Sequence, residues 1–506
     1  MNERRVVGLD LGISSAHTAV VLDPGGEQVC RRRCVPTVES FRELEDAALR
    51  GAPDGTRLEI VVEPTGPAWL PVAVFFGRRG HTVYRVSSAK AADLRRFFSR
   101  HAKSNAIDAV TLARLAFVDP GGLRPVELPG ANRASLDRRV RACDRLTRAA
   151  ATHKRRMKDL VRTLLPMSPL TGDIGRADLV VLERYADPNA LLRAGAARLT
   201  SVIVKASHNH QGSERAIQWV EAARASVALY DGAEAAAMAD LAAEVATEVR
   251  LLRAIEVELA GHAAARERAY GEVDPDALAR SLPGIAEVGG PVLQAVIGRA
   301  HRFENASQVR SFTGLAPKAS ETGETDRKSQ PMSKAGSSLL RSQLLRSADV
   351  ARTIDPQLAQ IYHRQMVERG ANHLKALCVV AAHLAERAWV VLARGTPYEL
   401  RDTDGRPVSQ REAKAIIAER WTVPEEVGAD GDRGRWGRPL TRPSRGMFRS
   451  ALEARQRGGL PQPTSSKSRP SRSSRGADDG SPLDEGSSLG NQSKTSTSPG
   501  RRSPIT

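Results

Sequence analysis

The sequence predicts an α/β domain at the N-terminus, then a long helical arm, a mainly helical C-terminal domain and a disordered basic tail. Three observations lead to this fold class. Strand-like and helix-like segments alternate in residues 5–118, apolar residues recur at steps of three and four before Pro166, and no aromatic residue follows Phe448. With 506 residues, 41% of them hydrophobic, the chain is long enough for about three domains.

The N-terminal region begins with three predicted strands. They are separated by the turn residues Gly12–Ser15 and by Asp23-Pro24-Gly25-Gly26. Helical and strand-like segments then alternate. The order β-β-β-α-β-α-β-α is that of the RNase H-like fold. The predicted strands are 6–11, 18–23, 28–35, 58–63 and 81–86, and the predicted helices are 38–50, 67–80, 87–100 and 104–117.

Three acidic residues occupy suggestive positions in these elements. Asp10 interrupts the first apolar strand, Glu63 ends the next buried strand, and Asp108 lies in the last helix. Carboxylates placed in this way can converge on divalent cations, which stabilise the attacking and leaving oxygens of a phosphoryl transfer. The pattern predicts a metal site of that kind. An actin-like sugar kinase has the same elements, but its further phosphate-binding loops are not found in the sequence.

The arm is predicted from two long amphipathic helices. The first carries an apolar stripe from Leu136 to Leu164, and the second covers residues 233–268. Such helices form an antiparallel coiled-coil pair or a dimerising arm. Residues 131–165 hold eleven Lys and Arg against three Asp, within a chain of net charge +18. We therefore expect a face that follows phosphate groups, with Arg138, Arg141, Arg145, Arg148, Lys154 and Arg155.

The C-terminal domain is predicted to carry a nucleophile. Leu282-Pro283-Gly284-Ile285 resembles the turn of a helix-hairpin-helix element, whose glycine would expose backbone N–H groups to phosphate. Further along, residues 318–329 form a polar stretch rich in hydroxyl groups. A hydroxyl that attacks a phosphodiester needs nearby cations to stabilise the developing charge. The candidate cations are Arg327, Lys328, Lys334 and Arg341.

Taken in order, these motifs resemble the DEDD transposases of bacterial insertion sequences, the one-hundred-ten group with its relatives one-hundred-sixteen and nine-hundred-two. The resemblance covers residues 5–400. It rests on Val7-Gly8-Leu9-Asp10, Val62-Glu63-Pro64-Thr65-Gly66, Lys103-Ser104-Asn105-Ala106-Ile107-Asp108-Ala109, Leu282-Pro283-Gly284-Ile285, Phe312-Thr313-Gly314-Leu315-Ala316-Pro317 and Met332-Ser333-Lys334-Ala335-Gly336.

The resemblance implies an enzyme that cleaves and exchanges DNA strands, with a RuvC-like domain of the RNase H fold. In the family, four acids bind Mg²⁺ and a serine attacks DNA. Asp10, Glu63 and Asp108 match three of the acids and are the expected metal ligands, whereas Asn105 stands at the remaining position. Thr322 stands where the family has its serine, and Ser320 is the alternative nucleophile.

The resemblance also implies partners. These are the DNA of the element ends and of the target, a structured guide RNA in some members, and further copies of the chain in a dimer or tetramer. Three alternatives stay open. The first is a metal-dependent Holliday-junction resolvase or nuclease without a covalent intermediate, which would cleave DNA without forming an adduct. The second is a nucleic-acid-binding protein that has lost its catalytic groups, and the third is an actin-fold kinase, which would bind a nucleotide and no DNA.

The predicted domains are a RuvC-like domain (1–125), the arm (126–270), the transposase domain (271–400), a loosely structured extension (401–454) and a disordered tail (455–506). No apolar run approaches the roughly 20 residues of a membrane-spanning helix, and no secretory signal is expected at the N-terminus. Four cysteines without a C-x-x-C pair indicate neither a disulfide framework nor a zinc finger. We expect a cytoplasmic, nucleoid-associated bacterial protein.

Overall fold

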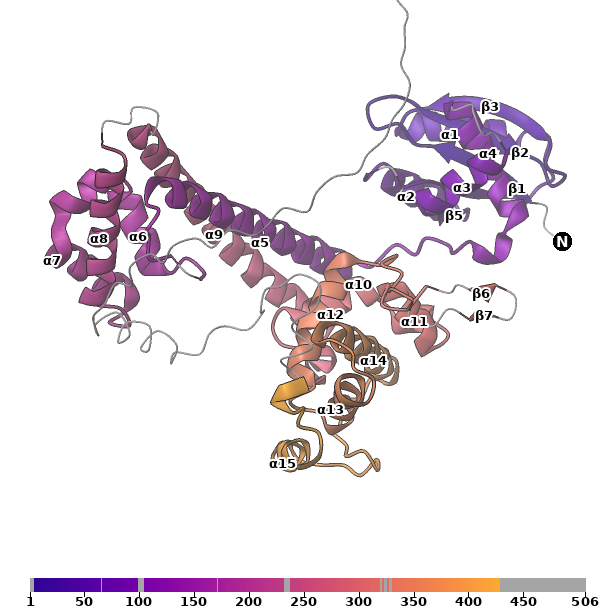
Figure 1. Cartoon of the computed structure of the whole chain (residues 1–506). Coiled ribbons are helices and arrows are strands. Elements are labelled where there is room, and N and C mark those ends of the chain that lie inside the picture. Colours follow the sequence, from indigo (N-terminus) through magenta and orange to yellow (C-terminus); the bar gives the residue numbers. More distant parts are fainter. Residues whose placement is uncertain are drawn as a thin grey trace, which may run out of the picture. The chain divides into compact units, whose positions relative to one another are not determined.

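The computed structural model describes residues 4–64, 66–98, 104–170, 172–231, 237–318, 321–322, 325–326 and 330–427 (Figure 1). The predicted tail and the second part of the predicted extension lie outside these residues. So do three residues predicted for the nucleophile region, Ser320, Arg327 and Lys328.

The N-terminal domain is built on one five-stranded sheet in the order β3-β2-β1-β4-β5. The central strand β1 is antiparallel to β2, which is antiparallel to β3, and β1 is parallel to β4, which is parallel to β5. All five strands predicted from the sequence are present. They are β1 (Arg4–Asp10), β2 (His17–Leu22), β3 (Gln28–Cys34), β4 (Arg57–Val62) and β5 (Thr82–Arg85).

Helices cover both faces of this sheet. Because side chains alternate along a strand, Val7 and Leu9 belong to one apolar core and Val6 to the other. The first core also contains side chains of α1 (Val38–Leu49) and α2 (Trp69–Arg78). The second contains side chains of α3 (Ser88–Phe98) and α4 (Asn105–Val118). A single turn of 3₁₀-helix, η1 (Pro120–Gly122), follows α4.

The arm consists of α5 (Ala131–Leu164) and α9 (Met238–Val273). The two helices are antiparallel, because Arg139 near the start of α5 contacts His262 near the end of α9, and His153 contacts Glu248. The sequence predicted two long helices here, and the structure contains both. The sequence did not predict the three helices at the distal end, which share a core with both long helices. These are α6 (Arg176–Tyr185), α7 (Pro188–Ser207, kinked at Gly195) and α8 (Ser213–Leu229).

The C-terminal domain is helical around one apolar core, which also includes Leu136 and Val140 of α5. Its central helix, α14 (His373–Arg394), is the one described helix with the length and hydropathy of a membrane span. Half of that segment is buried inside the protein, as in the core helix of a helical domain. The other helices are η3 (Leu278–Ser281), α10 (Gly289–Ile297), η4 (Ala300–Arg302), α11 (Ala306–Thr313), α12 (Ser338–Ala351), α13 (Pro356–His363), η5 (Arg364–Glu368) and α15 (Gln410–Arg420).

Two further features of this domain bear on the sequence predictions. Gly284 packs closely on α12, because a Cβ there would lie 2.3 Å from the carbonyl oxygen of Ser347. The glycine therefore allows a close contact with a helix, at a positive φ of 71°. Residues 401–427, in the stretch expected to be loosely structured, contain α15. A complete capping box of Ser409 and Glu412 starts that helix.

Candidate active site and basic surfaces

Asp10 and Glu63 follow neighbouring parallel strands. In the register of β1 and β4, Leu9 lies opposite Val62, so the next residue on each strand is one of the two acids. Both acids are half-buried. The carboxyl ends of parallel strands meet at the same edge of a sheet, and the two carboxylates therefore belong to one edge, which we call the acidic edge.

Helix α4 brings Asn105 and Asp108 toward the acidic edge. A Cβ on Gly8 would lie 1.9 Å from the carbonyl oxygen of Ala109, so α4 rests directly on β1. The guanidinium carbon of Arg4, at the start of β1, lies 5.7 Å from the centre of the Phe117 ring, near the end of α4. The start of β1 thus lies beside the end of α4, so the two elements run antiparallel. The first turn of α4 therefore lies at the end of the strand that carries Asp10.

The start of α4 is set by local chemistry. The hydroxyl of Ser104 accepts a hydrogen bond of 3.2 Å from the backbone N–H of Ile107, which is an N-cap. The helix thus begins at Asn105 and holds Asp108 in its first turn. The backbone amides there favour a negative charge.

Asp108 is already paired with an arginine. The guanidinium of Arg95, in α3, lies 3.0 Å from its carboxylate, and these side chains are 24% and 15% exposed. Within the described ranges, no three His, Cys, Asp or Glu residues come together closely enough to hold a metal ion. The oxygen donors of the acidic edge suit a hard cation such as Mg²⁺. A cation that uses Asp108 must displace Arg95.

The turn after Asp10 is held by His17, whose role the sequence did not reveal. The N–H of Gly12 donates a hydrogen bond of 3.1 Å to Nδ1 of His17. Burial lowers the pKa of His17, which keeps the ring neutral and its Nδ1 able to accept. A Cβ on Gly12 would lie 2.4 Å from the carbonyl oxygen of Ser15, so this tight turn requires glycine.

The predicted polar loop of the C-terminal domain contains a small β-hairpin. Its strands are β6 (Glu321–Thr322) and β7 (Thr325–Asp326), with Thr322 opposite Thr325. The base of the hairpin has a ladder of its own. The N–H of Lys318 donates to the carbonyl of Pro331 at 3.0 Å, and the N–H of Ser333 donates to that of Ala316 at 2.8 Å. Thr322 therefore lies in a paired strand and not in an open loop. Among the described residues, its pair with Thr325 is the one farthest from the base of the hairpin.

Two sequence motifs meet where the hairpin joins the domain. A Cβ on Gly336 would lie 2.0 Å from the carbonyl oxygen of Phe312, so the two chain segments touch backbone to backbone. Arg341 donates to the carbonyl oxygens of Thr313 at 3.2 Å and Gly336 at 3.4 Å. Arg341, one of the residues predicted to contact nucleic acid, therefore also joins the two segments.

Lys334 also forms part of this junction. It adopts a positive φ of 57°, and its N–H donates to the carbonyl of Gly314 at 3.0 Å.

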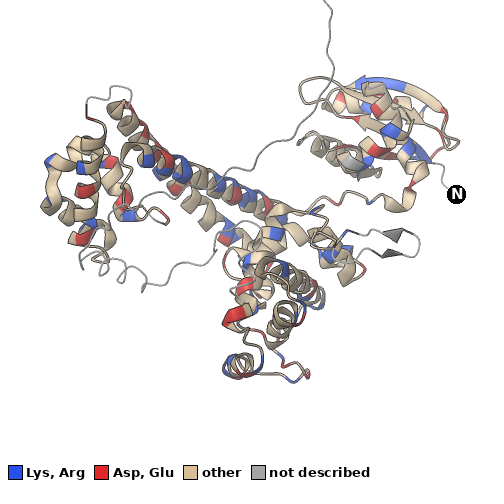
Figure 2. Cartoon of the chain, in the orientation of Figure 1, with Lys and Arg blue, Asp and Glu red and all other residues tan. Residues whose placement is uncertain are grey.

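The predicted basic face of α5 is partly neutralised. Basic residues follow α5 along its length in Figure 2. Two of the predicted arginines pair with an Asp four residues earlier, Arg141 with Asp137 and Arg148 with Asp144. Lys154 pairs with Asp173 at 3.3 Å. Among the described residues, no carboxylate pairs with the three exposed arginines that remain of the predicted set, Arg138, Arg145 and Arg155.

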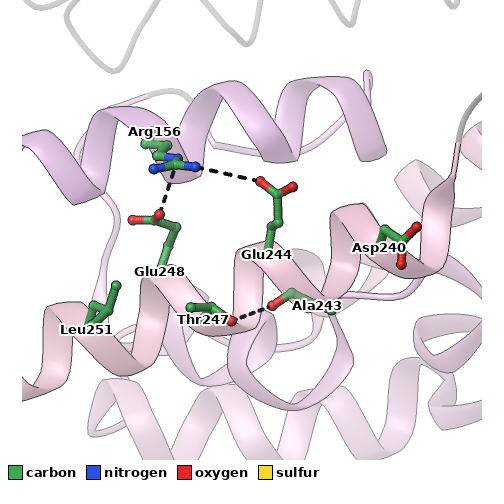
Figure 3. A pocket seen from close by; sticks show the side chains of 7 residues that line it. All are labelled: Arg156, Asp240, Ala243, Glu244, Thr247, Glu248 and Leu251. Atoms are coloured by element: carbon green, nitrogen blue, oxygen red, sulfur yellow. Dashed lines mark hydrogen bonds and ion pairs between the residues drawn. The ribbon is translucent and has the colours of Figure 1, made fainter. Parts of the chain in front are cut away.

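A buried acid interrupts the contact between α5 and α9. The carboxylate of Glu248 lies 2.6 Å from Nδ1 of His153 and 3.2 Å from Nε of Arg156, and its side chain is only 6% exposed. Beside it lies a surface pocket of about 510 Å³, with Arg156, Glu244 and Glu248 on its wall (Figure 3). Because a buried carboxylate needs both partners, this group favours one register of the two helices. From the sequence, His153 was counted in the apolar stripe of its helix, and nothing marked Glu248 as a buried residue.

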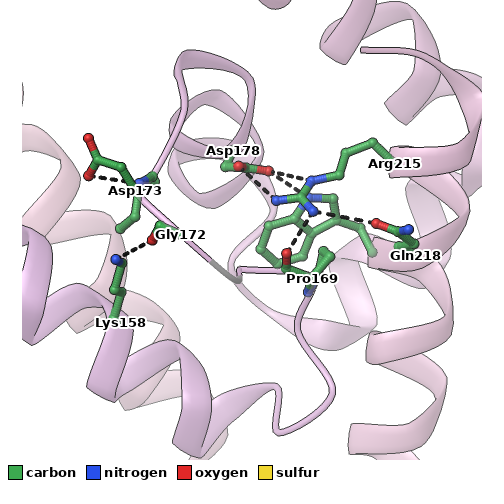
Figure 4. A network of polar contacts seen from close by, with 9 residues as sticks. Lys158, Pro169, Gly172, Asp173, Asp178, Arg215 and Gln218 are labelled. Carbon is green, nitrogen blue, oxygen red and sulfur yellow. Dashed lines mark hydrogen bonds and ion pairs between the residues drawn. The ribbon is translucent and has the colours of Figure 1, made fainter. Parts of the chain in front are cut away.

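The distal helices are joined by a second buried group (Figure 4). Arg215 of α8 makes two hydrogen bonds, of 3.0 and 2.9 Å, to the carboxylate of Asp178 in α6. Trp219 donates to the same carboxylate at 3.2 Å, and Arg215 also donates to the carbonyl of Pro169. All charged partners are satisfied inside the bundle, which makes this group structural.

Two protein-family models match the two regions of the chain that carry the sequence motifs. A family model described as Transposase matches residues 7–166, which include the acidic edge and α5. A second model, described as Transposase IS116/IS110/IS902 family, matches residues 276–364, which include the hairpin. The distal helices α6–α8 lie between the two matched ranges.

Similar curated proteins come from bacterial insertion elements. An insertion element IS110 uncharacterized 43.6 kDa protein of Streptomyces coelicolor is 27% identical over 78% of this chain and 95% of its own length. An insertion element IS116 uncharacterized 44.8 kDa protein of Streptomyces clavuligerus is 25% identical over 77% and 95%. A pilin gene-inverting protein of Moraxella lacunata is 25% identical over 24% and 38%. The two family models and these relatives together support an insertion-sequence transposase.

Proposed function

We propose that this transposase cleaves and exchanges DNA strands through a metal-binding acidic edge on an RNase H-like, RuvC-like domain and a hydroxyl nucleophile on the C-terminal hairpin. The observation that carries the proposal is the acidic edge itself. The strand register and the direction of α4 direct Asp10, Glu63, Asn105 and Asp108 to one edge of the sheet. The strand order β3-β2-β1-β4-β5 supports the RNase H-like assignment.

The acidic edge would bind Mg²⁺ through oxygen atoms. Asp10, Glu63 and Asp108 supply charged oxygens, and Asn105 supplies a neutral carbonyl. When bound, the cation supplies Lewis-acid stabilisation of the oxygens on the reacting phosphate. Arg95 balances the charge of Asp108 at 3.0 Å.

The hydroxyl of Thr322 or Ser320 would attack the phosphorus of a phosphodiester. A bond forms between the hydroxyl oxygen and phosphorus, the bond from phosphorus to one sugar oxygen breaks, and that oxygen takes up a proton. The number of phosphoester bonds stays constant, so the exchange needs no energy source. Arg327, Lys328 and Lys334 flank these hydroxyls in sequence and would stabilise the developing charge.

The partners follow from this chemistry and from the family. The substrates are the DNA of the element ends and of the target, and the exposed arginines of α5 would bind their backbone phosphates. A structured guide RNA and assembly into a dimer or tetramer are further parts of the proposal. We place the protein in the bacterial cytoplasm, at the nucleoid.

Trapping the covalent intermediate on a suicide DNA substrate tests the mechanism. We expect a protein–DNA adduct that is lost in Asp10→Ala and Glu63→Ala and in the double variant Thr322→Ala/Ser320→Ala. An adduct in that double variant contradicts the nucleophile assignment, and full activity of both acid variants contradicts the metal site. Cleavage without any adduct would instead indicate a resolvase or nuclease.

Two observations favour a second candidate, a nucleic-acid-binding protein without catalysis. Asn105 stands where the family has an acid, and Asp108 is held in an ion pair with Arg95. This candidate predicts DNA binding that does not depend on Mg²⁺, with neither cleavage nor adduct under any metal. The same suicide substrate therefore separates the two.

A further inference from the structure

Three arginines gather where α5 meets the C-terminal domain. Arg133 lies in the first turn of α5, whereas Arg299 and Arg302 follow α10. The carboxylate of Glu127 lies 3.8 Å from Arg299, and the charge of Asp274 acts on Arg133. The three arginines together form a local concentration of positive charge.

Within the described part of the chain, Arg133 and Arg302 each donate one hydrogen bond, to a backbone carbonyl. Arg133 donates to the carbonyl of Gln294 at 2.9 Å, and Arg302 donates to that of Val296 at 3.3 Å. Both carbonyls belong to the last turns of α10, where cations are favourable. A guanidinium has five N–H donors, so one bond each leaves room for an anion.

The electrostatic surroundings point the same way. Desolvation lowers the pKa of Arg133, with the charge of Arg299 acting in the same direction and that of Asp274 against it. Desolvation lowers the pKa of Arg302 as well, with Glu127 acting against it and Arg133 and Arg85 in the same direction. The pair of Arg299 and Glu127 is weak, because these side chains are 53% and 59% exposed. A bound anion would relieve this repulsion.

Aromatic rings hold Arg302 in place. Its guanidinium carbon lies 4.6 Å from the ring centres of both Phe303 and Phe312. Phe312 belongs to α11, and Gly314 at the end of α11 begins the base of the hairpin. The arginine cluster therefore lies beside the segment that carries the proposed nucleophile.

We propose that Arg133, Arg299 and Arg302 bind the phosphate backbone of duplex DNA, and that Glu127 occupies part of this site until DNA displaces it. The inference rests on the proposed function, because the hairpin must meet DNA. It adds a phosphate site distinct from the basic face of α5. Duplex DNA is favoured over RNA because the site lies beside α11, which leads into the segment that is proposed to attack DNA.

Salt-dependent binding of the full chain to random-sequence duplex DNA tests this site. The double variant Arg299→Gln/Arg302→Gln should bind at least about tenfold more weakly. Each phosphate contact contributes about 0.9 to the slope of log K against log salt, so the slope should fall by nearly two. The control variant Arg369→Gln/Arg411→Gln removes the same charge from exposed arginines of the same domain and should leave both values unchanged.

Two single variants keep the test decisive if the double variant is unstable. Arg299→Gln loses only an exposed partner, so its fold should persist while the slope falls by about 0.9. Glu127→Gln should bind DNA several-fold more tightly, because it removes the competing carboxylate. A structural role of this ion pair predicts no such gain.

The possible failures are distinguishable. If the wild-type chain binds no duplex DNA at low salt, the proposed function fails. If the wild type binds and the folded variants match it in affinity and slope, only the phosphate site is overturned. The site is also overturned if the variants lose binding to a structured RNA while they keep their affinity for duplex DNA.

Discussion

Replacing Gly8 by alanine tests the contact that positions the acidic edge. Taken from the sequence, this change should stabilise the domain, because glycine inside a strand costs about 0.5–1 kcal/mol relative to alanine. The structure predicts the opposite sign. The new Cβ would lie 1.9 Å from the carbonyl oxygen of Ala109 and 2.4 Å from the backbone nitrogen of Ala113.

The magnitude follows from these distances. Cβ atoms essentially never approach another atom within 3.0 Å, so α4 must move by about 1 Å to admit the methyl group. Overpacking of this kind costs about 1–3 kcal/mol, and a gap of that size forfeits a quarter to a half of each dispersion contact along the helix. We expect a loss of about 3 kcal/mol. Asn105 and Asp108 move with α4, so strand cleavage should fall too.

Peptide-resolved hydrogen exchange on the full chain measures this locally. Protection of β1 and α4 should fall about 100-fold in Gly8→Ala, since 1.4 kcal/mol corresponds to a factor of ten. Gly77→Ala in α2 is the matched control. A Cβ at Gly77 meets nothing within 4 Å, and this change should be neutral or stabilising by up to about 1 kcal/mol. Wild-type protection in Gly8→Ala would refute the proposed packing of α4 on β1.

Three further predictions concern the ionisable groups. Arg95→Gln should raise the affinity for Mn²⁺ about tenfold in calorimetry, because it frees Asp108. Arg215→Met should destabilise the distal bundle by about 3–5 kcal/mol, measured by hydrogen exchange, because it leaves the carboxylate of Asp178 buried without its cation. Because the pKa of His17 is lowered from 6.5, the unfolded chain takes up a proton at mildly acidic pH that the folded chain does not. Stability should therefore fall as pH drops below about 6.5, and less so in His17→Asn, as followed by thermal melting.

Each of these has an opposing outcome. Arg96→Gln removes the neighbouring exposed arginine and should not change metal affinity; equal affinities for both variants would exclude Arg95 as a competitor. Arg224→Met changes an exposed arginine of α8 and should cost under about 0.5 kcal/mol, so a similarly small effect of Arg215→Met would show that the buried pair is dispensable. An identical pH dependence of melting in wild type and His17→Asn would assign the acid sensitivity to other groups.

The N-terminal domain and the arm were largely predictable because their signals are local. Alternation of apolar residues identifies strands, and the stripe from Leu136 to Leu164 identifies one side of a long helix. The distal helices were missed because several of their buried residues are alanines, which carry little apolar signal. The hairpin was missed as a β-structure because Glu321–Thr322 and Thr325–Asp326 are only two residues long each.

The residues of the candidate site also fall into two groups, those that stand out in the sequence and those that only the packing of helices reveals. Asp10, Glu63 and Asp108 stand out in the sequence because acids interrupt or end apolar segments. Arg95 carries no such mark, since an arginine in an amphipathic helix looks like any solvated residue. Only the packing of α3 beside α4 places it against Asp108. Arg341 is the reverse case, a basic residue near a polar loop whose observed contacts are two backbone carbonyls.

By itself the sequence determined the kinds of elements, their order and the chemical types available for a phosphodiester reaction. Periodicity, turn residues and isolated charges within apolar segments are properties of neighbouring residues, so they can be read without a fold. The tertiary structure decided which charges face each other. It paired Arg95 with Asp108 and Glu248 with His153, and it brought the like charges of Arg133, Arg299 and Arg302 near one another. These are contacts between residues from different elements, and their energies depend on distances and burial that exist only once helices and strands have packed.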